Sequence, residues 1–308
     1  MYLKRKIDEY LLEWKKNEER LPLIIKGARQ IGKTESINHF AEQNYSNIVS
    51  INFVLEPKYK TILSDGYAVE DIIKNISMID TSKKFIAGDT VIIFDELQEF
   101  PDIATALKSF RIDGRFDVIC SGSLLGINYR KIHSNSVGYK TDYEMFSMDF
   151  EEFLWAKGYS EKHIEDILKH MQTGTPFSET ELSVYKKLFL EYCVLGGMPA
   201  VVKVYIEKNL FTDTLEIQRQ IQMDYEEDIR KYGLQLEPDY RAWENPIGGS
   251  DNGSFAKVGI PIIWYHTDGH PDYHQPSDHA DRLNWDKVVE ITKASFLNMW
   301  KMANEKSF

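Results

Sequence analysis

Short apolar segments alternate with amphipathic ones along the first half of the chain. Strands that are apolar on both faces and alternate with helices are typical of a parallel sheet covered on both sides. We therefore expect an α/β domain over residues 1–148. The expected strands are residues 21–26, 48–53, 91–94 and 118–120, and helical spacing of apolar positions marks residues 3–17 and 33–43.

The pattern changes twice further along the chain. Residues 149–233 have helical periodicity almost throughout, which predicts an all-helical part. Residues 234–308 differ again, because they hold four of the eight His, four of the six Trp and five of the ten Pro. In this last part we expect a strand at 260–265 and a helix at 285–304. Three parts are therefore predicted, with boundaries near residues 149 and 234.

The amino-acid composition excludes several classes of protein. The 308 residues are 43% hydrophobic and 28% charged, which excludes a disordered or low-complexity chain. The formal net charge is −11, so no nucleic-acid site is predicted. Cys120 and Cys193 lie in apolar runs and are both expected in the core. No apolar stretch approaches the about 18 residues that span a membrane, and no signal peptide is visible, so a cytoplasmic protein is expected.

A glycine-rich segment follows the first expected strand. The residues from Gly27 to Thr34 read GARQIGKT, which fits G-x-x-x-x-G-K-[ST] between a strand and a helix. In such a loop the backbone N–H groups and the helix N-terminus face phosphates, and Gly27 and Gly32 allow the close approach. Lys33 would bind the β- and γ-phosphates of ATP, and the Thr34 hydroxyl would ligate Mg²⁺. The alternative is a chance match in a glycine-containing turn.

Polar residues end two further expected strands. Asp95 and Glu96 follow the apolar run at 91–94. Asp95 would hold the hydration shell of Mg²⁺, and Glu96 would activate the attacking water; alternatively, Asp95 caps the next helix. Ser121 and Ser123 follow the strand at 118–120, and either would contact the γ-phosphate. A simple Ser-Gly-Ser turn explains these two residues equally well.

Several segments of the first 233 residues together resemble a known family. They are LPLIIKGARQIGKT, VIIFDELQEFP, SGSLLG, MFSMDFEEFLWAKG, YCVLGGMPAVV and DYEEDIRKY. In this order they resemble the prokaryotic AAA-type ATPases that carry a restriction-nuclease-like C-terminal domain. The resemblance implies Mg²⁺-dependent ATP hydrolysis by Lys33, Thr34, Asp95 and Glu96, with the helices after residue 149 as a lid. Gln98 also fits the family pattern, without an implied role.

The chain departs from that family in two respects. Gly138-Tyr139 stands where many relatives have Gly-Arg, so an arginine finger is unassigned. Arg111, Arg115 and Arg130 are the nearby candidates. AAA-type ATPases often complete their site in trans, so a homo-oligomer is one expectation. The family's winged-helix and nuclease-like parts have no counterpart after residue 233.

The last 75 residues resemble a different family. GGSDNGSFAKVGIPIIWYHTDGHPDYHQPSDHADRLNWDKVVEIT is similar to the C-terminal end of the bacterial di-zinc aminopeptidases, which are related to glutaminyl cyclases. The resemblance makes His274 the last zinc ligand and places Asp251 beside the pocket. His266, His270 and His274 recur every four residues, but the intervening glycine and prolines disfavour a helix, so they are either metal ligands or polar loop residues.

The tail lacks the ligands that would make it a peptidase. The family's other ligand motifs are absent upstream, and a catalytic zinc needs about three protein ligands. Zinc and peptidase activity are therefore not expected. We interpret the chain as a chimera joined near Gly233-Leu234. The leading functional hypothesis is an AAA-type ATPase; the alternatives are a zinc aminopeptidase and a nucleotide-dependent interaction protein without hydrolysis.

Overall fold

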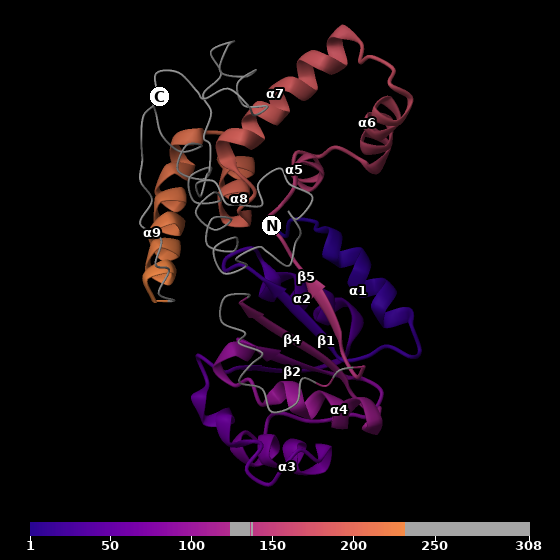
Figure 1. The fold of residues 1–308 in the computed structure, drawn as a ribbon, viewed down its shortest axis with the longest axis vertical. Helices are drawn as coiled ribbons and strands as arrows, with labels where there is room; N and C mark the ends of the chain where they lie inside the picture. The colour runs from indigo at the N-terminus through magenta and orange to yellow at the C-terminus, as the bar shows by residue number, and fades with distance from the viewer. Residues whose placement is uncertain (124–135, 137, 232–308) are drawn as a thin grey trace, which may run out of the picture. The chain divides into compact units, whose positions relative to one another are not determined.

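A computed structural model describes residues 1–123, 136 and 138–231, which form an α/β core followed by helices (Figure 1). The strands are β1 (Leu23–Gly27), β2 (Asn47–Asn52), β3 (Thr90–Asp95), β4 (Asp117–Ser123) and β5 (Thr141–Glu144). The helices of the core are α1 (Lys6–Lys16), α2 (Lys33–Asn44), α3 (Val69–Ile79) and α4 (Ile103–Asp113). The later helices are α5 (Phe150–Ala156), α6 (Glu161–Thr173), α7 (Glu179–Leu195), α8 (Pro199–Lys208) and α9 (Leu215–Lys231).

The chain divides into two compact units. They are Met1–Gln218 and Arg219–Phe308. The α/β core and helices α5 to α8 all lie in the first unit. Within it, the predicted α/β fold with a parallel sheet and helices is confirmed, whereas the boundaries at 149 and 234 stay predictions.

The five strands form one sheet in the order β2-β3-β4-β1-β5. Every neighbouring pair is parallel, and the register places Gly27 beside Ser123 and Phe94 beside Cys120. Because all strands run in the same direction, their carboxyl ends meet at one edge. Loops that leave those ends are therefore brought together, whatever their separation in sequence.

Apolar side chains cover both faces of the sheet. All six residues of β3 are buried, as the sequence TVIIFD predicts for a central parallel strand. Helices α1 and α2 pack on each other and α2 on β1 and β4, while α3 and α4 lie on the other side (Figure 1). The α3/α4 side contains a large core cluster, including Phe53, Phe94 and Phe110. Burial of each such ring contributes about 1.5–3 kcal/mol.

Local capping explains where two later helices begin. Asp149 and Glu152 form a reciprocal capping box at the start of α5, and Ser178 and Glu181 form one at the start of α7. Pro199 occupies the first turn of α8, where its missing N–H is no loss. Helix α5 contacts both α7 and α8.

The expectation that both cysteines are core residues is half wrong. Cys120 is buried in β4, as expected, but Cys193 is exposed on α7. Helix α7 has apolar residues on several sides, and Phe189, Leu190 and Val194 are exposed as well. An apolar run inside such a helix does not reveal which face is buried.

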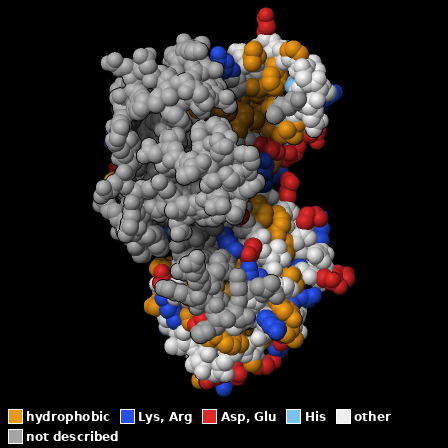
Figure 2. Space-filling model, in the orientation of Figure 1, with side chains coloured by type: hydrophobic (Ala, Val, Ile, Leu, Met, Phe, Trp, Pro, Cys, Tyr) orange, Lys and Arg blue, Asp and Glu red, His pale blue; other side chains and the backbone are white. Residues whose placement is uncertain are grey.

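The visible surface of the core carries both signs of charge. Figure 2 shows acidic and basic side chains interspersed over its lower part. In the part of the chain that the structure describes, no helix is long and apolar enough to cross a membrane. The expected strand at 260–265 and helix at 285–304 lie outside the described residues, as do Arg130, Asp251 and the four tail histidines.

The two thiols are expected to differ in reactivity. Burial raises the pKa of Cys120 strongly, whereas Cys193 is exposed and its pKa is raised by partial burial. A thiol reagent at pH 8 should label one cysteine in the native chain and two in denaturant, because the thiolate must be both formed and reachable. Cys193→Ser should abolish the native reaction; rapid native labelling of Cys120 would contradict the fold.

Candidate functional site

The glycine-rich loop connects β1 to α2 at the carboxyl edge of the sheet. Gly27 ends β1, and a Cβ built on it would lie 2.3 Å from the Met145 carbonyl oxygen, so only glycine fits there. Gly32 has φ +91° and stands immediately before α2, and Gln30 has φ +62°. These left-handed conformations curl the backbone between strand and helix, as a phosphate-binding loop requires.

The Lys33 side chain donates hydrogen bonds to the backbone of this loop. Its Nζ donates to the carbonyl oxygens of Gly27, at 3.0 Å, and Ala28, at 2.6 Å. Burial lowers the pKa of Lys33, while attraction to Glu96 and Asp95 opposes the shift. A phosphate anion is a stronger partner for an ammonium group than a neutral carbonyl. The loop therefore holds a partly desolvated cation that is suited to an incoming anion.

Asp95 joins three other elements at the same edge. Its side chain is buried, and its Oδ2 accepts from Asn52 Nδ2 at 3.0 Å and from Thr34 Oγ1 at 3.2 Å. Ser121 Oγ also donates to this carboxylate. The structure thus brings together Thr34, Asp95 and Ser121, and adds Asn52 from β2, which sequence reasoning missed. Thr34 and Asp95 offer the hard oxygen ligands that Mg²⁺ prefers.

Glu96 is held in an unusual conformation beside Asp95. Its backbone has φ 60° and ψ 51°, a left-handed conformation that costs a non-glycine residue about 1 kcal/mol or more. Its carboxylate accepts from Gln98 Nε2, and Gln98 Oε1 accepts from the Ser123 N–H at 3.1 Å. Gln98, whose role the sequence left open, therefore links Glu96 to the end of β4.

A cavity of about 740 Å³ adjoins these residues. Its size suits a small-molecule ligand. Lys33, Thr34, Asn52 and Glu96 line one part of it. Helix α8 lines another part through Pro199, Ala200 and Lys203.

Two of the candidate finger arginines lie away from this edge. Arg111 is in the last turn of α4, and Arg115 precedes β4, whose opposite end carries Ser121 and Ser123. Arg115 Nη2 forms ion pairs of 2.7 Å with Asp113 and with Glu70. Strand β4 runs from residue 117 to residue 123, and each of its six steps adds about 3.3 Å. This length separates both arginines from the glycine loop, so neither reaches the loop within the same chain.

The fold is an α/β core with a parallel sheet, and a glycine-rich loop leads from its strand β1 into helix α2. Residues 19–154 match the family described as AAA domain, and residues 202–298 match peptidase family M28. The chain is thus similar to an AAA domain in its first half and to peptidase family M28 further along, and each match covers less than half of its length. The peptidase match begins within α8, and its candidate ligand His274 lies outside the described residues. Kinship with relatives that carry a restriction-nuclease-like domain stays a prediction.

Several solved structures resemble the chain at low identity. A Walker-type ATPase of Pyrococcus abyssi is 14% identical over 75% of this chain and 77% of its own, with a TM-score of 0.44. RuvB of Thermotoga maritima, a Holliday junction branch migration motor, is 14% identical over 83% and 80%, with a TM-score of 0.39. PCH-2 of C. elegans is 12% identical over 65% and 59%, with a TM-score of 0.37. A search of curated proteins found no match.

The lowered pKa of Lys33 predicts a pH dependence of stability. Between that folded-state pKa and the ordinary value of 10.5, the unfolded chain binds more protons than the folded chain. The contribution of Lys33 to the free energy of unfolding therefore rises with pH in this window. Urea unfolding of the nucleotide-free chain and of Lys33→Met, from pH 8.5 to 10.5, measures it. If the free energies of unfolding of wild type and Lys33→Met differed by the same amount at every pH, the buried environment of Lys33 would be contradicted.

Proposed function

We propose that the chain binds ATP with Mg²⁺ at the carboxyl edge of the sheet and hydrolyses it. The observation that carries this proposal is the convergence of Lys33, the Thr34–Asp95 pair and Glu96 around one glycine loop. Separate segments supply a cation, two hard oxygen ligands and a further carboxylate. ATP hydrolysis needs this combination.

Each of these residues has a distinct proposed role. Lys33 would leave the carbonyls of Gly27 and Ala28 and bind the β- and γ-phosphates. Thr34 and Asp95 would hold Mg²⁺, which neutralises phosphate charge when bound. Glu96 would accept a proton from the attacking water, with Gln98 fixing its orientation. Because ATP is the proposed substrate, we place the chain in the cytoplasm.

The arginine that stabilises the transition state would come from a second copy of the chain. Arg111 and Arg115 lie at the far end of β4, so neither is proposed to act on the site of its own chain. An arginine finger raises turnover by about 10³–10⁵-fold. Specific activity should therefore increase with protein concentration and level off once the oligomer is saturated. Specific activity independent of concentration, over a range in which sedimentation shows a change of mass, would contradict a shared site.

Hydrolysis should depend on two residues in different ways. Wild type should release phosphate from ATP only with Mg²⁺, and Lys33→Ala should lose both ATP binding and turnover. Glu96→Gln should still bind ATP, but its turnover should fall by about 10²-fold or more, because a general base contributes about that much. Phosphate release and binding of a fluorescent ATP analogue measure these effects.

Glu99→Gln is the matched control. Glu99 is exposed and pairs with Lys60 at 3.2 Å, outside the cavity lining. Its turnover should equal that of wild type. Undiminished turnover in Glu96→Gln would refute the role of Glu96. Tight ATP binding by wild type without turnover would instead identify a nucleotide-dependent switch.

A further inference from the structure

Arg5 is a buried cation that belongs to none of the sequence motifs. It immediately precedes α1, and only 3% of its surface is exposed. A charged side chain is seldom buried so completely without dedicated partners. The partners of this guanidinium therefore show which parts of the chain it connects.

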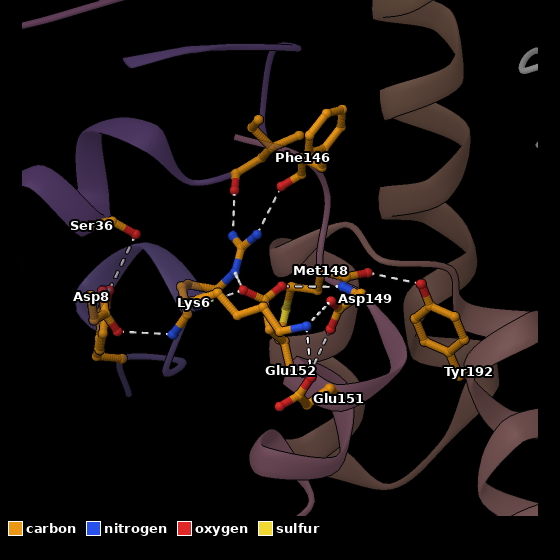
Figure 3. A network of polar contacts seen from close by, with 12 residues as sticks. Lys6, Asp8, Ser36, Phe146, Met148, Asp149, Glu151, Glu152 and Tyr192 are labelled. Carbon is orange, nitrogen blue, oxygen red and sulfur yellow. Dashed lines mark hydrogen bonds and ion pairs between the residues drawn. The ribbon is translucent and has the colours of Figure 1, made fainter. Parts of the chain in front are cut away.

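The partners of Arg5 come from three separate places in the chain. Its Nη1 donates to the Ile31 carbonyl oxygen at 2.7 Å, and its Nη2 donates to the Phe146 carbonyl oxygen at 2.8 Å. Its Nε lies 3.1 Å from Glu152 Oε1. Phe146 and Glu152 belong to the network of polar contacts in Figure 3. One side chain thus joins the glycine loop, the segment after β5 and helix α5.

The bond to Ile31 sets the direction of a loop amide. In a trans peptide the carbonyl and the following N–H point in opposite directions. Since the Ile31 oxygen is directed at Arg5, the N–H of Gly32 is directed away from Arg5, on the other side of the loop backbone. A Cβ on Gly32 would lie 3.5 Å from Arg5 Nη1, so the guanidinium fits closely against this peptide.

Glu152 ties the same cluster to the later helices. Only 4% of its surface is exposed, and its carboxylate also accepts from the backbone N–H of Lys6, at 2.7 Å, and of Asp149, at 3.1 Å. Just before α5, the Met148 N–H donates to the Gly197 oxygen at 2.7 Å. The Met148 oxygen accepts from Tyr192 at 2.9 Å (Figure 3). These contacts reach α7 and the start of α8.

The first turn of α8 lies beside the glycine-rich loop. A Cβ on Gly32 would lie 3.6 Å from Pro199 Cγ, and Pro199 and Lys203 line the cavity beside Lys33. The Gly32 peptide is therefore enclosed by Arg5 and by the first turn of α8. Helix α8, which lines the cavity, is thus linked to the loop through the contacts of Met148, Glu152 and Arg5.

We propose that Arg5 is a positioning residue that orients the Gly32 peptide for phosphate binding, and that its pairing with Glu152 couples the loop to helices α5 to α8. This inference rests on the proposed ATPase function. Arg5 itself contacts no reacting atom: it acts through the loop backbone. Its loss should therefore weaken ATP binding more than it slows turnover at saturating ATP.

The test compares Arg5→Gln and Arg5→Lys with Arg20→Gln. Arg20 is a matched control, because its Nε and Nη2 donate to Asp117 at 2.7 and 3.0 Å, at the far end of β4. Three quantities are measured well below the unfolding transition: amide exchange of residues 28–34 without nucleotide, the Kd for Mg-ATP, and kcat against KM. Arg5→Lys keeps the charge beside Glu152 and guards against failure of the glutamine variant to fold.

In Arg5→Gln we expect exchange of the Gly32 amide and the Kd for Mg-ATP each to rise about tenfold or more, with a smaller change in kcat. Arg5→Lys should lie between this variant and wild type. Arg20→Gln should lower the denaturant midpoint and leave the loop exchange and the Kd unchanged. Adding Glu152→Gln to Arg5→Gln should weaken binding by less than the product of the two single effects, because the two residues act as one unit.

Folded Arg5 variants with wild-type loop exchange and wild-type Kd would overturn the proposal and assign Arg5 a purely structural role. If Glu152→Gln changed the Kd for Mg-ATP by the same factor in wild type and in Arg5→Gln, the proposed coupling of Arg5 and Glu152 would be refuted. Failure of wild type to bind ATP would refute the proposed function alone. The exchange measurement would still decide whether Arg5 orients the loop, since it needs no nucleotide.

Discussion

The carboxylate of Asp95 sits at the end of a strand that is buried along its whole length, and its burial must be compensated by hydrogen bonds. A buried carboxylate without such partners would carry a large desolvation cost. The side-chain donors come from Thr34, Asn52 and Ser121, which belong to α2, β2 and β4. They meet only because all the strands are parallel and in this register. The site is thus a consequence of how the sheet satisfies one buried acid.

The charges around Asp95 are arranged for a ligand that is itself highly charged. Lys33 is partly desolvated and bonded to neutral carbonyls, and Glu96 has a left-handed backbone conformation while its carboxylate accepts a hydrogen bond from Gln98. The environment of Lys33 and the backbone conformation of Glu96 are both less favourable than those these residues have in the unfolded chain in water. Residues kept in such states at a cavity are typical of preorganised sites, in which the folded chain has already met the cost of orientation. Arg5 extends this support to the outside of the loop.

Part of this arrangement can be predicted from sequence. The apolar run of β3 followed by Asp95, and the glycine loop with Lys33 and Thr34, are local patterns with known geometry, and the α/β fold follows from them. Asn52 has no local signal, because its relevance depends on β2 lying next to β3. Arg5 stands in a charged segment just before the first helix, and its role depends on contacts with residues 31, 146 and 152, which are distant in sequence. Cys193 was misplaced because periodicity does not resolve the faces of an apolar helix.

The central claim is that the nucleotide-free chain already contains a site for one ATP with its Mg²⁺. Isothermal titration of ATP into the full chain, with Mg²⁺ and with a chelator, tests it most directly. We predict one ATP per chain, with affinity that falls sharply when Mg²⁺ is removed, because Thr34 and Asp95 then contribute no metal-mediated contact. Absence of binding, or binding that is indifferent to Mg²⁺, would contradict it.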